Sequence, residues 1–125
     1  MITHPFHKHK LVYIEVPKTG CTSIKWALRH LRDGNPPPRP DRHLHGWYGF
    51  THIKPEELHT KYAGYKSFVV VRNPYDRFRS HFDSMREGTQ GWDKTVLEFA
   101  QGFRESKWFK TPHGKPQTNL IGRDL

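Results

Sequence analysis

LVYIEVPKTGCTSI, residues 11–24, joins a stretch typical of a β-strand to one typical of a helix through a single short turn. Residues 10–16 are rich in β-branched and aromatic side chains, so we expect a strand there, as the first regular element of the chain. Beyond the turn, apolar side chains recur at offsets of three, four and seven from Ile24, which predicts a helix over residues 22–32. That helix should end before Asp33-Gly34-Asn35.

A second transition of this kind is KSFVVVRNPYDRFRS, residues 66–80. Its consecutive apolar positions predict a strand over residues 66–72, buried on both faces in the centre of a sheet. Asn73 is the expected N-cap, and Pro74 the first residue, of a helix that runs to about residue 87. The order of strands and helices predicts an α/β fold with these two strands parallel and joined by a right-handed crossover.

The remaining segments carry weaker signals. Four prolines within residues 35–40 predict an exposed extended loop, and the Gly- and aromatic-rich residues 43–52 predict another. Residues 55–58 are typical of the first turn of a short helix, and residues 93–105 of a last helix. We expect residues 111 onward to be irregular because they contain two prolines and two glycines.

Size and charge restrict the function. A chain of 125 residues fits one domain, residues 1–125, whose core must draw on the 14% of aromatic residues. Twenty-one Lys and Arg against twelve Asp and Glu give a net charge of +9, which favours an anionic partner. Charge alone does not choose among nucleotide, nucleic acid, sulfated sugar and acidic lipid, and a basic surface can also serve solubility alone.

Cysteine and histidine limit the kinds of site. The single cysteine, Cys21, excludes an internal disulfide framework and a four-cysteine zinc site. Ten histidines include two groups that could supply metal ligands, but neither has a recognised spacing, so we expect no metal. No apolar run approaches the roughly 20 residues of a membrane span, and the N-terminus is too polar for a secretory signal. For this chain taken as a whole protein, we expect a cytoplasmic location and no membrane partner.

The turn after the first strand has the chemistry of an anion site. Free N–H groups from Gly20 to Ser23 at a helix N-terminus suit a phosphate or sulfate oxygen, and Lys18 adds a full charge. The Walker pattern is absent, because the lysine precedes the glycine, and this disfavours an ordinary ATPase or nucleotide kinase. An ordinary strand-to-helix turn with a surface lysine is the alternative.

The second transition offers a matching pair of groups. Arg72 ends the strand, while Arg77 and Ser80 lie three residues apart on one face of the next helix. A guanidinium and a hydroxyl can hold one phosphate from two sides, and ligands of parallel sheets bind at the carboxyl ends of the strands. In the alternative interpretation, Arg77 and Arg79 are solvated or paired with nearby aspartates.

These two motifs carry a family resemblance. PKTGCTSI resembles the 5′-phosphosulfate loop, and RNPYDRFRS the 3′-phosphate motif, of sulfotransferases that use 3′-phosphoadenosine 5′-phosphosulfate (PAPS), above all the carbohydrate and bacterial or phage-like branch. The resemblance implies a three-layer, P-loop-like parallel sheet flanked by helices. It implies sulfuryl transfer from PAPS to an acceptor hydroxyl, releasing 3′-phosphoadenosine 5′-phosphate (PAP), without a metal.

By the same resemblance, Lys18 would neutralise the leaving group and Arg72 and Ser80 would hold the 3′-phosphate. The implied donor-binding residues are Pro17, Lys18, Thr19, Gly20, Cys21, Thr22, Ser23, Arg72 and Ser80. The family usually continues with further helices, whereas this sequence stops at Leu125, so we expect a small, truncated version of the fold.

Transfer also needs a base beside the acceptor hydroxyl, and a neutral histidine suits that role. Related enzymes often carry a histidine before the second phosphate motif, which makes His52 the catalytic candidate and His45 the runner-up. Alternatively, both histidines merely line a polar loop. PHGKPQTNL, residues 112–120, resembles a His-x-x-Pro-Gln stretch on the acceptor side of carbohydrate sulfotransferases. It implies substrate contacts from His113, Lys115 and Gln117 and a saccharide acceptor, although a simple surface loop fits too.

Two other functions remain open at this point. A basic nucleic-acid-binding module would use the net charge of +9 with the aromatic side chains of Trp47, Tyr48 and Phe50. The nucleic-acid interpretation does not explain why the sequence contains both loop motifs, so nucleic acid is the less favoured partner. A catalytically inactive, sulfotransferase-like domain that binds nucleotide is the other alternative.

Overall fold

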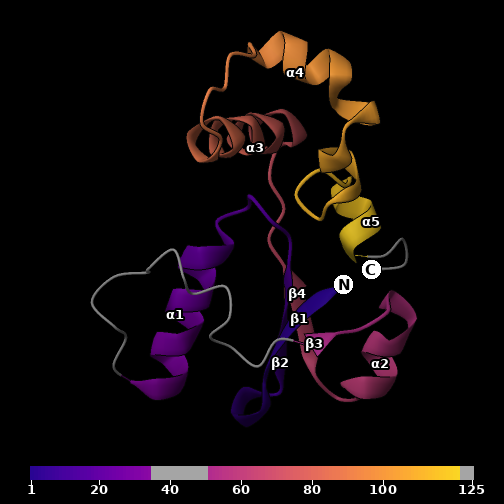
Figure 1. Ribbon diagram of the computed structural model, residues 1–125. Helices are drawn as coiled ribbons and strands as arrows, with labels where there is room; N and C mark the ends of the chain where they lie inside the picture. Colours follow the sequence, from indigo (N-terminus) through magenta and orange to yellow (C-terminus); the bar gives the residue numbers. More distant parts are fainter. Residues whose placement is uncertain (35–50, 122–125) are drawn as a thin grey trace.

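The computed structural model describes residues 1–34 and 51–121. Within them, four strands form one mixed sheet in the order β3-β1-β2-β4 (Figure 1). The strands are β1 (Ile2–Phe6), β2 (Leu11–Glu15), β3 (Thr51–His52) and β4 (Lys66–Val69). β2 and β4 run parallel, as predicted, whereas β1 is antiparallel to both β2 and β3. The sheet is therefore mixed rather than purely parallel.

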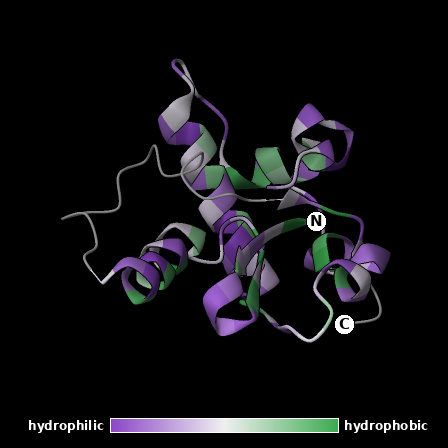
Figure 2. Cartoon of the chain, turned by 90° about the horizontal axis from the view of Figure 1, so that it is seen from below, coloured by the Kyte–Doolittle hydropathy of each residue, from purple (hydrophilic) through white to green (hydrophobic). Residues whose placement is uncertain are grey.

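Helices cover both faces of the sheet. Side chains alternate along β2, so Tyr13 packs with Leu28 of α1 (Cys21–Asp33) on one face. Val12 and Ile14 pack with Leu58 of α2 (Leu58–Lys61) on the other face. A 3₁₀ turn, Pro55–Glu57, leads into α2. Figure 2 shows hydrophobic residues toward the middle of the molecule and mostly hydrophilic outer turns. The predicted three-layer α/β architecture is confirmed.

A helical part lies beyond the carboxyl ends of β2 and β4 (Figure 1). It begins with α3 (Pro74–Gly88) and α4 (Val96–Gly102), continues through 3₁₀ turns at Phe103–Glu105 and Lys107–Lys110, and ends in α5 (Gln117–Ile121). Aromatic rings join α3 to α4 and its neighbours, with centroid separations such as 5.5 Å between Phe78 and Phe99. The rings of this cluster are Phe78, Phe82, Trp92, Phe99 and Phe103.

The prediction that the chain begins with the strand at residues 10–16 is wrong. That strand exists as β2, but β1 precedes it and pairs with it from Ile2↔Glu15 to Phe6↔Leu11. The sequence of β1 lacks the apolar pattern that predicts a strand, because its buried residues Thr3 and His4 are polar. Their partners come from other strands: Thr3 Oγ1 donates to the Thr51 carbonyl at 3.0 Å, and His4 Nε2 lies 2.5 Å from Glu15 Oε2. Thr51 and His52, expected within a loop, form β3.

The position predicted for the second strand is also wrong. β4 ends at Val69, lies at an edge of the described sheet, and is only half-buried at Phe68 and Val69. Val71, in the extended stretch that follows, is 59% exposed. A run of valines does not distinguish an edge from a centre, because the order of strands depends on which partners pair with β2. Here β1 occupies the other side of β2.

Local signals for helix ends were more reliable. Asn73 Oδ1 accepts a hydrogen bond from the Tyr75 N–H at 2.9 Å, which confirms the predicted N-cap before Pro74. α1 ends at Asp33, with Gly34 in the left-handed conformation (φ +73°) as its cap. α4 begins three residues later than the predicted residue 93, because Thr95 and Glu98 form a capping box.

The C-terminal segment is more ordered than predicted. Residues 111 onward, expected to be irregular, contain a turn followed by α5. The proline-rich residues 35–40, residues 43–50 with His45, and Leu125 lie outside the described residues. No helix in the described part of the chain is long and apolar enough to cross a membrane. Nor do residues 1–34 and 51–121 bring together three His, Cys, Asp or Glu side chains able to hold a metal ion.

Candidate functional site

The loop between β2 and α1 has the geometry of an anion cradle. Lys18 and Gly20 both adopt left-handed backbone conformations, with φ of +67° and +85°. Gly20 does so without a side-chain penalty, and α1 starts at the next residue. Thr19 Oγ1 donates to the Val16 carbonyl at 2.7 Å and closes the turn. The first N–H groups of α1 have no acceptor within the helix, as at any helix start, so they are available to an anion.

The ends of β2 and β4 meet at one pocket of about 290 Å³. Arg72, beyond β4, reaches the first loop directly, since its Nη1 donates to the Lys18 carbonyl at 3.3 Å. The predicted proximity of the two loop motifs is confirmed by this contact. The pocket is lined by Lys18, Gly20, Cys21, Thr22, Arg72, Ser80 and His113.

A second pocket, of about 300 Å³, adjoins the first because both are lined by Arg72 and Ser80. Its charged lining from α3 is mostly acidic, with Asp76, Asp83 and Glu87 against Arg79, and Ser84 also lines it. The Lys18 ammonium donates a hydrogen bond to the Ser84 hydroxyl, so the lysine spans from the first loop to α3. Burial lowers the pKa of Lys18 from its ordinary value, although the opposite charge of Glu87 acts against this.

Arg77 connects three segments around the pocket. It is only 7% exposed, and its Nε donates to the Pro17 carbonyl at 2.9 Å. Its two terminal nitrogens donate to the carbonyls of Pro112, His113 and Lys115 at 2.9 to 3.1 Å. The alternative of a solvated Arg77 is therefore wrong, whereas Arg79 is exposed and lies 3.4 Å from an Asp83 oxygen. Arg77 ties the first loop to residues 112–115.

His113 lines the pocket and stacks on a second histidine, His81, which sequence reasoning missed. His81 is 3% exposed, and its ring lies 5.8 Å from that of His113 at an interplanar angle of 9°. Burial, followed by the charges of His113, Lys18 and Arg77, lowers the pKa of His81 to about 4. His81 is therefore neutral near pH 7. The sequence feature that could have identified His81 is its position four residues after Arg77, which puts both side chains on the same helix face.

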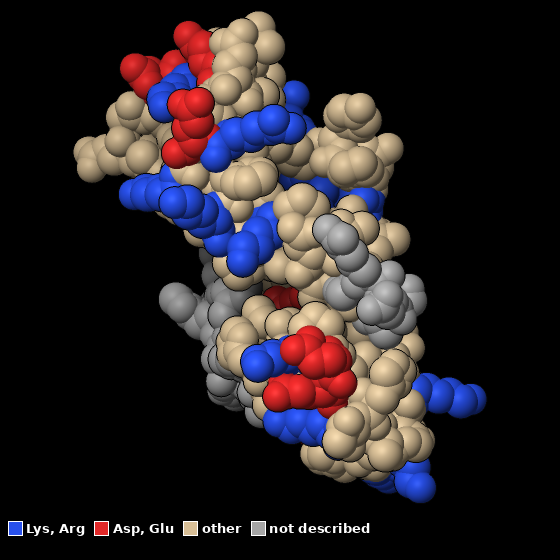
Figure 3. Space-filling view, turned by 90° about the vertical axis from the view of Figure 1, so that its right-hand side faces the viewer, with Lys and Arg blue, Asp and Glu red and all other residues tan. Residues whose placement is uncertain are grey.

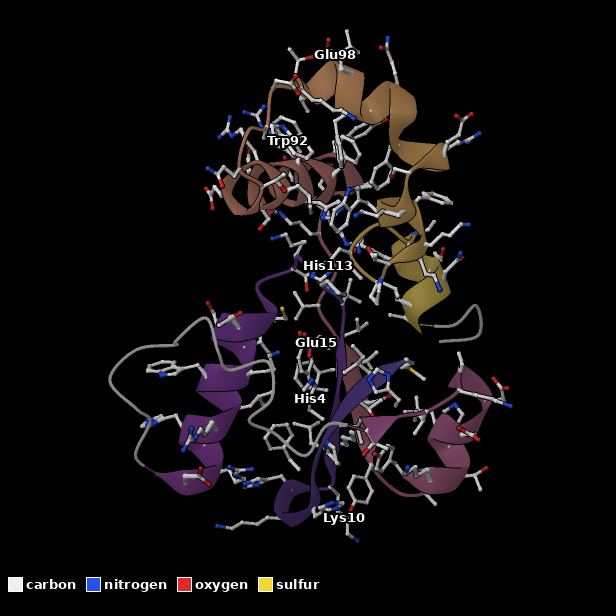
Figure 4. The ribbon with its side chains drawn as sticks, viewed as in Figure 1. His4, Lys10, Glu15, Trp92, Glu98 and His113 are labelled. Carbon is white, nitrogen blue, oxygen red and sulfur yellow. The ribbon has the colours of Figure 1, made fainter. Side chains whose placement is uncertain are left out.

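A buried ionic network supports the first loop from below. Glu15, the last residue of β2, lies 2.5 Å from His4 Nε2 and 3.1 Å from the Lys25 ammonium. Burial alone would raise the pKa of Glu15, but the His4 hydrogen bond and the Lys25 charge lower it to about 2. Figure 4 shows His4 and Glu15 on the sheet below His113, which lies between α3 and the end of β2. The network joins β1, β2 and α1.

The other predicted site residues are dispersed. His52 lies on β3, opposite Ile2 of β1, and is therefore two strands away from β2 and not among the lining residues. Gln117 holds the backbone of Arg72, accepting from its N–H at 3.0 Å and donating to its carbonyl at 2.8 Å. Lys115 contributes its carbonyl to Arg77. His45 lies outside the described residues.

Within the first loop, the predicted residues divide by role. Pro17 and Thr19 shape the loop through the contacts described above, and Ser23 is exposed on the first turn of α1 without lining the pocket. Figure 3 shows Lys and Arg side chains gathered in a band across the middle of one face of the molecule. Such a surface attracts anions.

A family model described as "Sulfotransferase family" matches residues 5–116, a span that includes both loop motifs and His113. Neither the curated proteins nor the solved structures give a match.

Proposed function

The chain belongs to the sulfotransferase family, and from that premise we propose that it binds PAPS in the pocket between β2 and β4 and transfers its sulfuryl group to an acceptor hydroxyl. The observation that carries the proposal is that Lys18 and Arg72, from two separate strand ends, line one pocket together with the N-terminus of α1. A nucleotide with anionic groups at two ends needs such a pair of cationic positions.

The groups in the pocket fit this donor. The N–H groups at the start of α1 and the Lys18 ammonium suit the phosphosulfate end, and the Arg72 guanidinium and Ser80 hydroxyl suit the 3′-phosphate. When bound, PAPS supplies a sulfuryl group already activated by its link to phosphate. Lys18 would stabilise the negative charge that develops on the departing phosphate.

We further propose a saccharide acceptor. Support comes from the band of Lys and Arg on the face shown in Figure 3, since a basic surface favours an anionic sugar chain. The sequence-based assignments of His113, Lys115 and Gln117 to the acceptor side remain predictions. The sequence-based assignment of His52 as the base has no support from the pocket, because His52 is not among its lining residues.

The nucleic-acid alternative has no comparable support. Its aromatic residues, Trp47, Tyr48 and Phe50, lie outside the described residues, and it does not explain why the two loop motifs share a pocket.

The donor site is tested by titrating PAP into the protein in a calorimeter. We expect wild-type protein to bind and Lys18→Ala and Arg72→Ala each to weaken binding about ten- to a hundredfold, the loss typical of one charged hydrogen bond. Arg104→Ala is the matched control, because it removes an equally charged side chain that is exposed and does not line the pocket. Absence of PAP binding by wild-type protein would refute the donor proposal.

A further inference from the structure

The pocket contains one kind of side chain suited to accept a proton. Of its lining residues in the described part of the chain, Lys18 and Arg72 are cations at neutral pH, and Thr22 and Ser80 are weakly acidic hydroxyls. Burial raises the pKa of the Cys21 thiol, so it stays protonated. The remaining titratable group is the imidazole of His113. An imidazole is ordinarily mostly neutral at pH 7 and accepts protons readily.

The backbone around His113 is held in place. Arg77 donates to three carbonyls of residues 112–115, including that of His113 itself at 3.1 Å. Within the turn, the N–H groups of Gly114 and Lys115 both donate to the Thr111 carbonyl, at 3.0 and 3.1 Å. Gly114 packs so closely that an added Cβ would lie 2.2 Å from the Trp108 carbonyl oxygen. The turn therefore has little freedom to carry His113 away from the pocket.

The ring of His113 also has a firm support. His81 stacks on it from α3 and is itself packed against Phe99 and Phe103, with ring centroids 6.0 and 5.8 Å away. Because His81 is buried in this aromatic surrounding, it cannot swing out of the stack without loss of packing. One loop and one helix thus set the position of a single imidazole, the arrangement expected of a preorganised catalytic group.

We propose that His113 is the catalytic base of the transfer, and that Arg77 and His81 are positioning residues for it. The inference rests on the proposed function. The imidazole takes the proton of the acceptor hydroxyl as that oxygen bonds to sulfur. The bond from sulfur to the bridging oxygen breaks, and its electron pair stays on the departing phosphate beside Lys18. This assignment differs from the sequence-based prediction of His52, which the structure places outside the pocket.

The test compares His113→Ala with His52→Ala. Release of PAP from PAPS is followed with water as the acceptor and again with a desulfated chondroitin chain. We expect His113→Ala to lose about a hundred- to ten-thousandfold in rate, the usual contribution of a general base, with PAP affinity changed less than threefold. Added imidazole should restore part of the rate of His113→Ala, which a purely structural role would not allow. His52→Ala should keep the wild-type rate.

A second measurement does not depend on the acceptor. On titration with PAP, the imidazole NMR signals of His113 should shift, whereas those of His52 should stay in place. The assignment is overturned if the His113 signals do not move, if His113→Ala turns over at the wild-type rate, or if wild-type protein binds PAP but never releases it from PAPS. Failure of wild-type protein to bind PAP would instead refute the donor site, so the two failures are distinguishable.

Discussion

Arg77 sets much of the site geometry from a buried position. Its guanidinium directs hydrogen bonds to four backbone carbonyls, which belong to the first loop and to residues 112–115. A guanidinium can do this because its donors form a rigid planar fork, whereas an ammonium offers a compact charge on a flexible stem. Arg77 therefore links the first loop to the proposed base, His113, without having to contact PAPS or the acceptor.

Replacing Arg77 tests this link. We expect Arg77→Lys to keep the charge but to lose two or three of the carbonyl bonds, lowering the free energy of unfolding by about 2–3 kcal/mol. Urea denaturation measures the change. Arg79→Lys is the control, because Arg79 is exposed and its ion pair should contribute about 0.5 kcal/mol or less. Equal urea midpoints for Arg77→Lys and wild type would contradict the proposed role of the fork.

His81 makes the stability of the protein depend on pH. Its pKa of about 4 in the folded protein lies below the ordinary 6.5. Between pH 4 and pH 6.5, the unfolded chain therefore binds a proton at His81 that the folded protein does not bind. Stability should fall by about 3 kcal/mol as the pH drops from 6.5 to 4, by the same linkage. Below pH 4.5 Glu15 adds a further loss, since its own pKa is about 2.

Replacing His81 isolates that dependence. His81→Phe keeps a ring in the stack. We expect its free energy of unfolding at pH 7 to match that of wild type, because His81 Nε2 has no hydrogen-bond partner among the described residues. The melting temperature should then fall less for His81→Phe than for wild type between pH 7 and pH 5. His59→Gln, which removes an exposed histidine, should retain the wild-type decrease. A full decrease in His81→Phe would assign the pH dependence to other groups.

At the scale of elements, three short connections supply most of the site, and the first turn of α1 and Ser80 of α3 supply the rest. β2 contributes the first loop at its carboxyl end, β4 leads into Arg72, and the segment before α5 contributes the turn at residues 111–115. Gln117, at the start of α5, pairs with the backbone of Arg72 through both oxygen and nitrogen. The third connection is therefore anchored to the second as well as to Arg77.

Gly114 is the position in the turn at residues 111–115 where an added side chain should be least tolerated. Gly114→Ala should force the turn to shift, because the new Cβ would meet the Trp108 carbonyl oxygen at 2.2 Å. We expect at least a tenfold slower release of PAP from PAPS and a PAP affinity within about threefold of wild type, since a small displacement of a catalytic group is costly. Gly102→Ala is the control, because nothing lies within 4 Å of the added Cβ. An unchanged rate for Gly114→Ala would mean that the turn adapts without moving the base.

At the scale of the whole molecule, the sheet with its covering helices and a mostly helical part lie next to each other (Figure 1). Residues of both parts line the pocket. The sheet has cores on both faces, and the helical part has its own aromatic cluster around Phe99. Among the described residues, the links that cross between these parts beside the pocket include the Lys18–Ser84 hydrogen bond, the contact of Arg72 with Lys18, and the bond from Arg77 to Pro17. Ligand affinity and the stability of this junction should therefore change together.

The sequence by itself determined the features that depend on neighbouring residues. The strand before Pro17, the helix after Gly20 and the Asn73-Pro74 helix start were all predictable, because turn and cap preferences act within a few residues. The family motifs were readable for the same reason, since each is contiguous in the chain.

Only the tertiary structure decided the features that depend on distant partners. β1 was missed because Thr3 and His4 are buried through bonds to other strands, and β4 was misplaced because its pattern carries no information about the order of strands. Arg77 links the backbone of His113 to that of Pro17 across 96 positions of sequence, and His52 does not line the pocket that His113 shares with Lys18. Hydrogen bonds and stacking between distant segments leave no periodic trace in a sequence, so these placements became visible only once the chain was folded.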